Sequence, residues 1–147
     1  METPEALAII AAGVFFLVGL LTGVQKYLQI MRSPTAEAHP YVDVCHRAAL
    51  MYAFASILLA KFAEVSQLST TVEVVALAAV LFYFAAAILT YFIHGVLKDT
   101  DNQLRPPFRM GSMEMSRGGI AFYMWSLVAA EIGGFLVLFY GVLVAVL

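Results

Sequence analysis

The amino-acid sequence predicts an all-α membrane protein, a four-transmembrane-helix bundle with up-down topology that forms a single domain over residues 1–147. Apolar residues make up 63% of the 147 residues and charged residues only 12%, whereas soluble domains average about 45–50% and about 25%. Four apolar stretches also reach the roughly 20 residues that a helix needs to cross a bilayer. The strand-like alternation of a membrane barrel is absent from the sequence.

The first two predicted spans cover residues 6–30 and 48–65. Acidic rather than basic residues precede the first one, so we expect a retained span and not a cleaved signal peptide. Lys26, near its end, suits a side chain that extends to the membrane surface. The second span ends at Lys61 and Glu64, which are three residues apart and able to pair on one helix face.

The last two predicted spans cover residues 72–96 and 119–147, and the connections between the spans are unequal. Residues 66–71 form a short link, whereas residues 31–47 and 97–117 form long polar loops that share one side. Every basic residue except Lys61 lies on the side of the long loops. The positive-inside rule therefore predicts cytoplasmic long loops and both termini on the non-cytoplasmic side, in the inner (plasma) membrane.

Composition excludes several classes of protein. Cys45 is the single cysteine, so an internal disulfide and a multi-cysteine metal cage are excluded. With eight basic residues and a net charge of -2, we expect no nucleic-acid partner, because too few basic groups are present to neutralise several phosphates. The expected partners are the lipid bilayer, a small apolar substrate and further copies of the chain in a homo-oligomer.

Nearly all of the titratable and metal-capable groups collect on the long-loop side, and we interpret this collection as a candidate site. The residues concerned are His39, Asp43, Cys45, His46, His94, Asp99, Asp101 and Asn102. The three histidines are candidate ligands for a metal or a haem iron. Asp43, one turn before His46, is placed to hold its Nδ1–H and leave Nε2 free for a metal. The alternative is that the histidines are surface residues without a ligand.

One face of the third span carries Tyr83, Thr90, Tyr91 and His94 at helical spacing. Phenol and imidazole groups need partners inside a membrane, so this face is expected to line a cavity. The alternative is an interfacial belt of tyrosines.

The second long loop begins with Asp99 and Asp101, which we expect to fold back over the site, with Asn102 and Arg105 as polar anchors. A calcium loop is excluded because the glycine and the distal glutamate of that motif are missing. The alternative is a solvated loop with helix-capping aspartates.

Glu131 is the residue of the fourth span that costs the most free energy to place in a membrane. It lies 14 positions after Arg117 and therefore roughly 20 Å deep. Intramembrane carboxyls usually face the protein interior and serve a function. The alternative is a protonated acid that bonds a neighbouring helix. Small residues around Glu131 predict a close helix contact there.

Short motifs resemble two groups of four-span membrane isomerases, the styrene oxide isomerases and the hydroxylaminobenzene mutases. Residues 19–23, Gly-Leu-Leu-Thr-Gly, are similar to a stretch of the mutases, and Ser33-Pro34 followed by Ala38-His39 is similar to the segment that enters the second span in both groups. Tyr91-Phe92 is similar to the stretch that carries the catalytic tyrosine of the epoxide isomerases. The likeness covers the span order and short segments of the first three spans.

This resemblance implies a redox-neutral rearrangement, from epoxide to aldehyde or from arylhydroxylamine to aminophenol. It also implies a haem b whose iron is held by His39, from the motif, or by His46, from the spacing to Tyr91. The chain departs from the pattern where the family carries an asparagine, replaced by Cys45 or Tyr52, and an acidic residue, replaced by Ala76 or Tyr83. The candidate catalytic residues are Tyr52, Tyr83, Tyr91, Asp99, Asp101 and Asn102, and the candidate cofactor or metal ligands are His39, His46 and His94.

Two other functions are compatible with the sequence. A haem-b or quinone-binding subunit of an electron-transfer complex would use a histidine pair such as His46 and His94. A small proton-coupled transporter would use Glu131.

Overall fold

The computed structural model describes residues 2–147 and consists almost entirely of helix. The four helices are α1 (Thr3–Arg32), α2 (Pro40–Val65), α3 (Thr70–Leu97) and α4 (Arg117–Val146). All four are long and apolar enough to cross a membrane. The prediction of a helical bundle with four helices able to span a membrane is therefore confirmed. Between α3 and α4, the two-residue strands β1 (Arg109–Met110) and β2 (Met113–Glu114) pair as a small antiparallel hairpin that the sequence did not predict.

The helices are longer than the apolar stretches that predicted them. The largest difference is at α2, which begins at Pro40 rather than at residue 48. Proline suits the first turn of a helix because the missing N–H has no partner there in any case. Charged residues in the outer turns end an apolar stretch without ending the helix, so Asp43 and His46 lie on α2.

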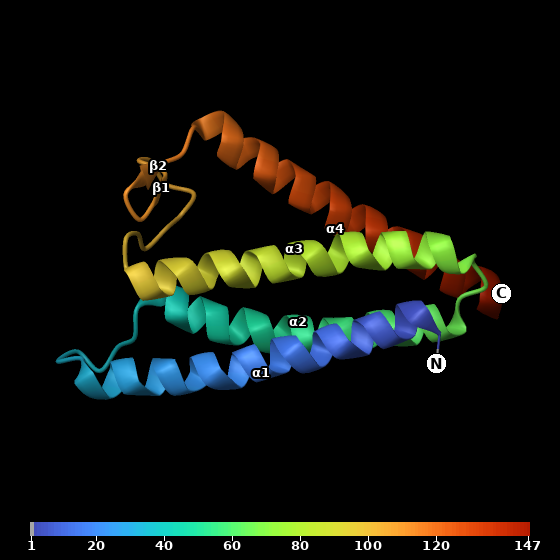
Figure 1. Cartoon of the computed structure of the whole chain (residues 1–147), viewed down its shortest axis with the longest axis horizontal. Helices are drawn as coiled ribbons and strands as arrows, with labels where there is room; N and C mark the ends of the chain where they lie inside the picture. The colour runs from blue at the N-terminus through green and yellow to red at the C-terminus, as the bar shows by residue number, and fades with distance from the viewer. Residues whose placement is uncertain (1) are drawn as a thin grey trace.

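Successive helices run in opposite directions, and both termini lie at the same end of the molecule (Figure 1). α1 and α2 pack along their length, because buried alanines at the contact, among them Ala8, Ala12, Ala49 and Ala53, let the two backbones approach closely. α3 lies beside this pair.

α4 departs from the rest of the bundle toward its N-terminal end, where it stands away from α3 (Figure 1). Its buried residues are Gly134, Leu138 and Gly141, all in the C-terminal half. A Cβ added at Gly134 would lie 2.6 Å from the Ala76 carbonyl oxygen of α3. Gly134 therefore permits the close contact between the C-terminal half of α4 and α3. The two helices diverge from this contact like the sides of a wedge, and the loop before α4 lies at the wide end of the wedge.

Candidate functional site

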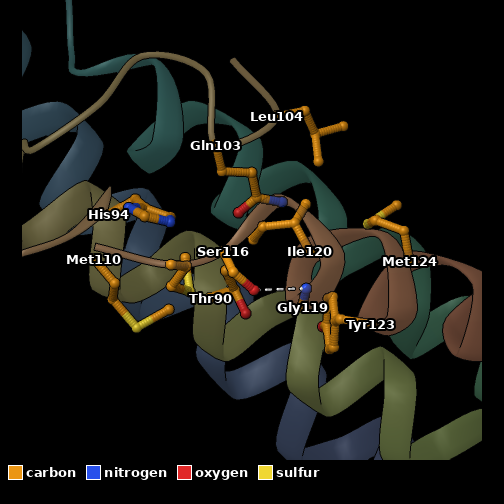
Figure 2. A pocket seen from close by; sticks show the side chains of 11 residues that line it. Thr90, His94, Gln103, Leu104, Met110, Ser116, Gly119, Ile120, Tyr123 and Met124 are labelled. Carbon is orange, nitrogen blue, oxygen red and sulfur yellow. Dashed lines mark hydrogen bonds between the residues drawn. The ribbon is translucent and has the colours of Figure 1, made fainter. Parts of the chain in front are cut away.

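A cavity of about 380 Å³ lies at the wide end of this wedge, between α3, α4 and the loop that joins them (Figure 2). α3 contributes Thr90 and His94, the loop contributes Gln103, and α4 contributes Tyr123. Most of the remaining wall is apolar and includes three methionines, Met110, Met115 and Met124. A volume of this order falls in the lower part of the range for small-molecule sites, about 300–1,000 Å³.

His94 is the most deeply buried polar group of the cavity, with 0% of its surface exposed. Its Nδ1 lies 2.7 Å from Asp99 Oδ1, and the Gly111 N–H donates to Asp99 Oδ2. Burial opposes ionisation of Asp99, but the hydrogen bonds from Gly111 and His94 outweigh it and hold the pKa of the carboxyl below its ordinary value. Asp99 is therefore the ionised acceptor, and His94 Nδ1 carries the hydrogen.

This arrangement leaves the second ring nitrogen of His94, Nε2, available to the cavity. His94 Nε2 is buried and finds no hydrogen-bond partner among residues 2–147. A carboxylate on one ring nitrogen fixes the tautomer and leaves the other nitrogen as a basic lone pair. His94 and Asp99 thus form a pair suited to proton transfer or to ligation at Nε2.

The end of α3 explains how Asp99 reaches the ring. Lys98 adopts a left-handed conformation, with φ of 53°, and its N–H donates to the His94 carbonyl oxygen at 2.8 Å. This C-cap turns the chain back over the last helical turn. Gly111, with φ of 61°, makes the hairpin turn that presents its N–H to Asp99.

Tyr41 joins the loop to the helices, and sequence reasoning missed it. Its ring centroid lies 5.0 Å from that of His94 and 5.9 Å from that of Tyr91. Its hydroxyl oxygen accepts a hydrogen bond from the Gln103 N–H. Tyr41 follows Pro40 in the first turn of α2, where its buried ring packs under the long loop.

His39 caps α2 instead of lining the His94 cavity. Its Nδ1 accepts a hydrogen bond from the Tyr41 N–H at 3.3 Å, and its ring lies 6.2 Å from that of Tyr41. Burial and the nearby Lys98 charge lower the pKa of His39, since both disfavour the imidazolium. The Tyr41 ring is therefore a neighbour of both the His39 ring and the His94 ring.

His46 lies in a different place, against α1. Its Nδ1 is 2.7 Å from the Gly19 carbonyl oxygen, and a Cβ at Gly23 would lie 2.9 Å from its Cε1. The prediction that Asp43 holds His46 is wrong, because Asp43 pairs with Lys26 at 2.5 Å and with Arg47 at 2.7 Å. Charge-assisted contacts with two cations hold the Asp43 carboxylate away from His46.

The structure does not gather the three histidines. No group of three His, Cys, Asp or Glu side chains that could hold a metal ion occurs within residues 2–147. His94 lines the cavity between α3 and α4, whereas His39 lines a polar hollow beside the end of α1. Of the predicted ligands, only His94 presents an unpartnered buried nitrogen.

Asp101 and Asn102 shape the loop and do not line the His94 cavity. Asp101 pairs with Arg105, and this contact lowers the pKa of the exposed Asp101 carboxyl. Asn102 Oδ1 accepts a hydrogen bond from the Leu104 N–H at 2.9 Å. Both residues line a smaller hollow together with Tyr41 and Tyr91.

The other predicted tyrosines face the bundle interior. The Tyr83 hydroxyl donates to Ser126 Oγ of α4 at 2.7 Å, and the Tyr52 ring stacks on Phe84 with centroids 4.1 Å apart. The face of α3 that carries Tyr83 and Tyr91 thus points at α4 and α2 rather than forming an interfacial belt. Neither Tyr52 nor Tyr83 lines the cavity with His94.

Tyr123 is the second site residue that sequence reasoning missed. It lines the His94 cavity from α4, and its hydroxyl is buried without a partner among the described residues (Figure 2). Its place in the apolar fourth span, without a periodic polar face, gave no signal in the sequence. The residues that line the cavity thus carry three buried polar atoms without a partner among residues 2–147, namely His94 Nε2, Gln103 Oε1 and the Tyr123 hydroxyl.

The haem expectation meets one favourable and one unfavourable feature. His94 Nε2, backed by Asp99, has the arrangement of a histidine ligand. The unfavourable feature is size, because the cavity volume of about 380 Å³ lies in the lower part of the range for small-molecule sites, about 300–1,000 Å³, whereas a haem is a large macrocycle. The cavity matches a small organic molecule, so we derive no step through haem, which stays a prediction.

No known protein family, curated protein or solved structure matches the chain. The resemblance to membrane isomerases therefore rests on the short sequence motifs alone.

Proposed function

We propose that this integral membrane protein is an isomerase that carries out a redox-neutral rearrangement of a small apolar substrate in the His94 cavity. One observation carries the proposal: a buried imidazole, held by an ionised carboxylate at Nδ1, presents a free Nε2 to a mostly apolar cavity. Such an imidazole takes up and returns a proton without being consumed. An isomerisation needs such a reversible proton transfer, and it needs no external reductant or oxidant.

The reaction follows for an aryl epoxide. Nε2 of His94 first takes up a proton, and the resulting imidazolium donates it to the epoxide oxygen. The benzylic C–O bond breaks as the oxygen takes the bonding electrons. A hydride then shifts from the neighbouring carbon to the benzylic cation, the carbonyl double bond forms, and the hydroxyl proton returns to Nε2. Asp99 stabilises the imidazolium that is present before the first step and again after the last.

The rest of the cavity supports this chemistry. Apolar walls keep out the water that would trap the benzylic cation as a diol. The Tyr123 ring offers a π face to the cation, and its hydroxyl is placed to orient the substrate oxygen. Met110, Met115 and Met124 adapt to the shape of an aryl group.

The test uses the purified chain in lipid nanodiscs with styrene oxide as probe and phenylhydroxylamine as the second substrate. We expect phenylacetaldehyde to form, and His94→Asn to lower the rate at least 100-fold, in line with the about 10²–10⁴ that a general acid supplies. His39→Asn is the matched control, because asparagine keeps the α2 cap. Turnover of neither probe, or full activity in His94→Asn, contradicts the proposal.

The haem alternative has its own readout, a visible spectrum of the purified protein before and after reduction. A Soret band that His94→Asn removes would assign Nε2 as the iron ligand rather than the proton donor. For the membrane, we propose the inner (plasma) membrane with the loops around the cavity on the cytoplasmic side, from the positive-inside distribution.

A further inference from the structure

A second cavity lies away from the His94 cavity, among α2, α3 and α4, with a volume of about 270 Å³. Glu131 is its one charged lining residue, and every other lining residue is apolar. The Glu131 Oε1 atom is buried and has no hydrogen-bond partner among residues 2–147. The lining of this cavity therefore offers the carboxyl no polar partner.

Glu131 lies near the middle of α4 (Arg117–Val146), roughly 20 Å from either end at ~1.5 Å per residue. An uncompensated carboxylate at that depth is costly. None of the ion pairs among residues 2–147 includes Glu131. Something from outside the chain must neutralise it whenever it is ionised.

A second copy of the chain cannot supply that charge. The eight basic residues lie in loops or within about two turns of a helix end: Lys26, Arg32, Arg47, Lys61, Lys98, Arg105, Arg109 and Arg117. A neighbouring copy in the same bilayer has the same distribution. It therefore brings no cation to the depth of Glu131.

The surroundings of Glu131 favour an organic cation over a metal ion. Phe84 and Phe135 line the cavity, and Tyr52 stacks on Phe84. Aromatic faces attract alkylammonium groups, whereas Na⁺ or Ca²⁺ needs several oxygen ligands. No group of three His, Cys, Asp or Glu side chains that could hold a metal ion occurs in the described part of the chain.

The position of the cavity favours a ligand that dissolves in lipid. Leu58 is 49% exposed and Ile132 is 56% exposed, and both belong to the cavity wall. Because these side chains lie on the outside of the bundle at the depth of the hydrocarbon core, the cavity is reached from the bilayer rather than from water.

We propose that this cavity binds a small lipophilic organic cation, an amine or a quaternary ammonium, whose charge Glu131 neutralises. The site is independent of the reaction proposed at His94, and its test uses no turnover measurement.

The test measures equilibrium binding of radiolabelled benzyltrimethylammonium to the full chain in neutral-lipid nanodiscs, with empty nanodiscs subtracted. We expect Glu131→Gln to weaken binding at least tenfold. Glu64→Gln, which removes an exposed carboxyl paired with Lys61, should leave binding unchanged. Neopentylbenzene, the uncharged isostere of the probe, should not compete.

Leu58→Trp provides a second variant that keeps the carboxyl and fills the mouth of the cavity. Leu58→Trp should also weaken binding at least tenfold. If Glu131→Gln does not fold, this variant alone tests the proposal. Equal binding to wild type and Glu131→Gln overturns the proposal, as does undetectable binding to the folded wild type. Equal competition by neopentylbenzene overturns it as well, since the site would then recognise shape and not charge.

Discussion

At the scale of single residues, Asp99 is the side chain on which the candidate site depends. It accepts from His94 Nδ1 and from the Gly111 N–H, and so holds both the ring and the hairpin turn. Asp99→Asn replaces an acceptor with a group that cannot stabilise an imidazolium. We expect it to lower the rearrangement rate at least tenfold and the unfolding free energy by about 1–3 kcal/mol. Rate assays and thermal unfolding in detergent measure the two effects.

The same residue predicts a dependence of stability on pH. The folded-state pKa of Asp99 is below the ordinary value of 3.8. Its contribution is therefore fully present above that value and is lost as the pH falls through the folded-state pKa. We expect the difference in melting temperature between wild type and Asp99→Asn to be large at neutral pH and to disappear at sufficiently acid pH. A difference independent of pH would contradict the ionised carboxylate.

At the scale of elements, Gly134 controls how α4 meets α3. A Cβ there would lie 2.6 Å from the Ala76 carbonyl oxygen and 2.6 Å from Val80 Cγ2. Gly134→Ala must push the helices apart, and we expect it to lower the unfolding free energy by about 1–3 kcal/mol.

Gly133→Ala is the matched control, because a Cβ at Gly133 meets nothing within 4 Å. This substitution should be neutral or slightly stabilising, since alanine favours helix over glycine. Circular dichroism during unfolding in detergent compares the two variants. Equal effects would mean that the close α3–α4 contact does not form.

The helices show which features the sequence was able to predict. Length and hydropathy predicted four spans, because the bilayer sets the length of every crossing helix. The start of α2 was missed, since apolar counting stops at charges while Pro40 and His39 begin and cap the helix. The β1–β2 hairpin was missed because its two-residue strands are too short to show a period.

The candidate site was predicted only in part, for a physical reason. His94 and Asp99 are five residues apart, and a loop that folds back over its own helix end brings them together. Tyr41 and Tyr123 reach the same place from other helices, and their positions depend on the angle of α4 and the course of the loop. Single-sequence periodicity shows which residues share a helix face, but not which faces of different helices meet.

At the scale of the whole molecule, orientation in the membrane is open to direct measurement. Cys45 is the single cysteine and is buried, so Cys45→Ala gives a cysteine-free background. In that background, Ser112→Cys reports on the hairpin loop and Gln67→Cys on the short α2–α3 link, since both positions are exposed. In intact cells we expect an impermeant maleimide to label position 67 and not position 112. The reverse pattern would place the long loops outside.

The divergence of α4 has a consequence for enzymology. Because the cavity lies between α3 and the N-terminal half of α4, we expect an oily substrate to reach His94 from the acyl chains without passing through buffer. The concentration of the substrate near the protein then depends on how it partitions between lipid and buffer. Empty liposomes added at constant protein concentration dilute the substrate in the lipid, so the apparent KM, expressed per volume of suspension, should rise. Unchanged values across a lipid titration would indicate delivery through the aqueous phase.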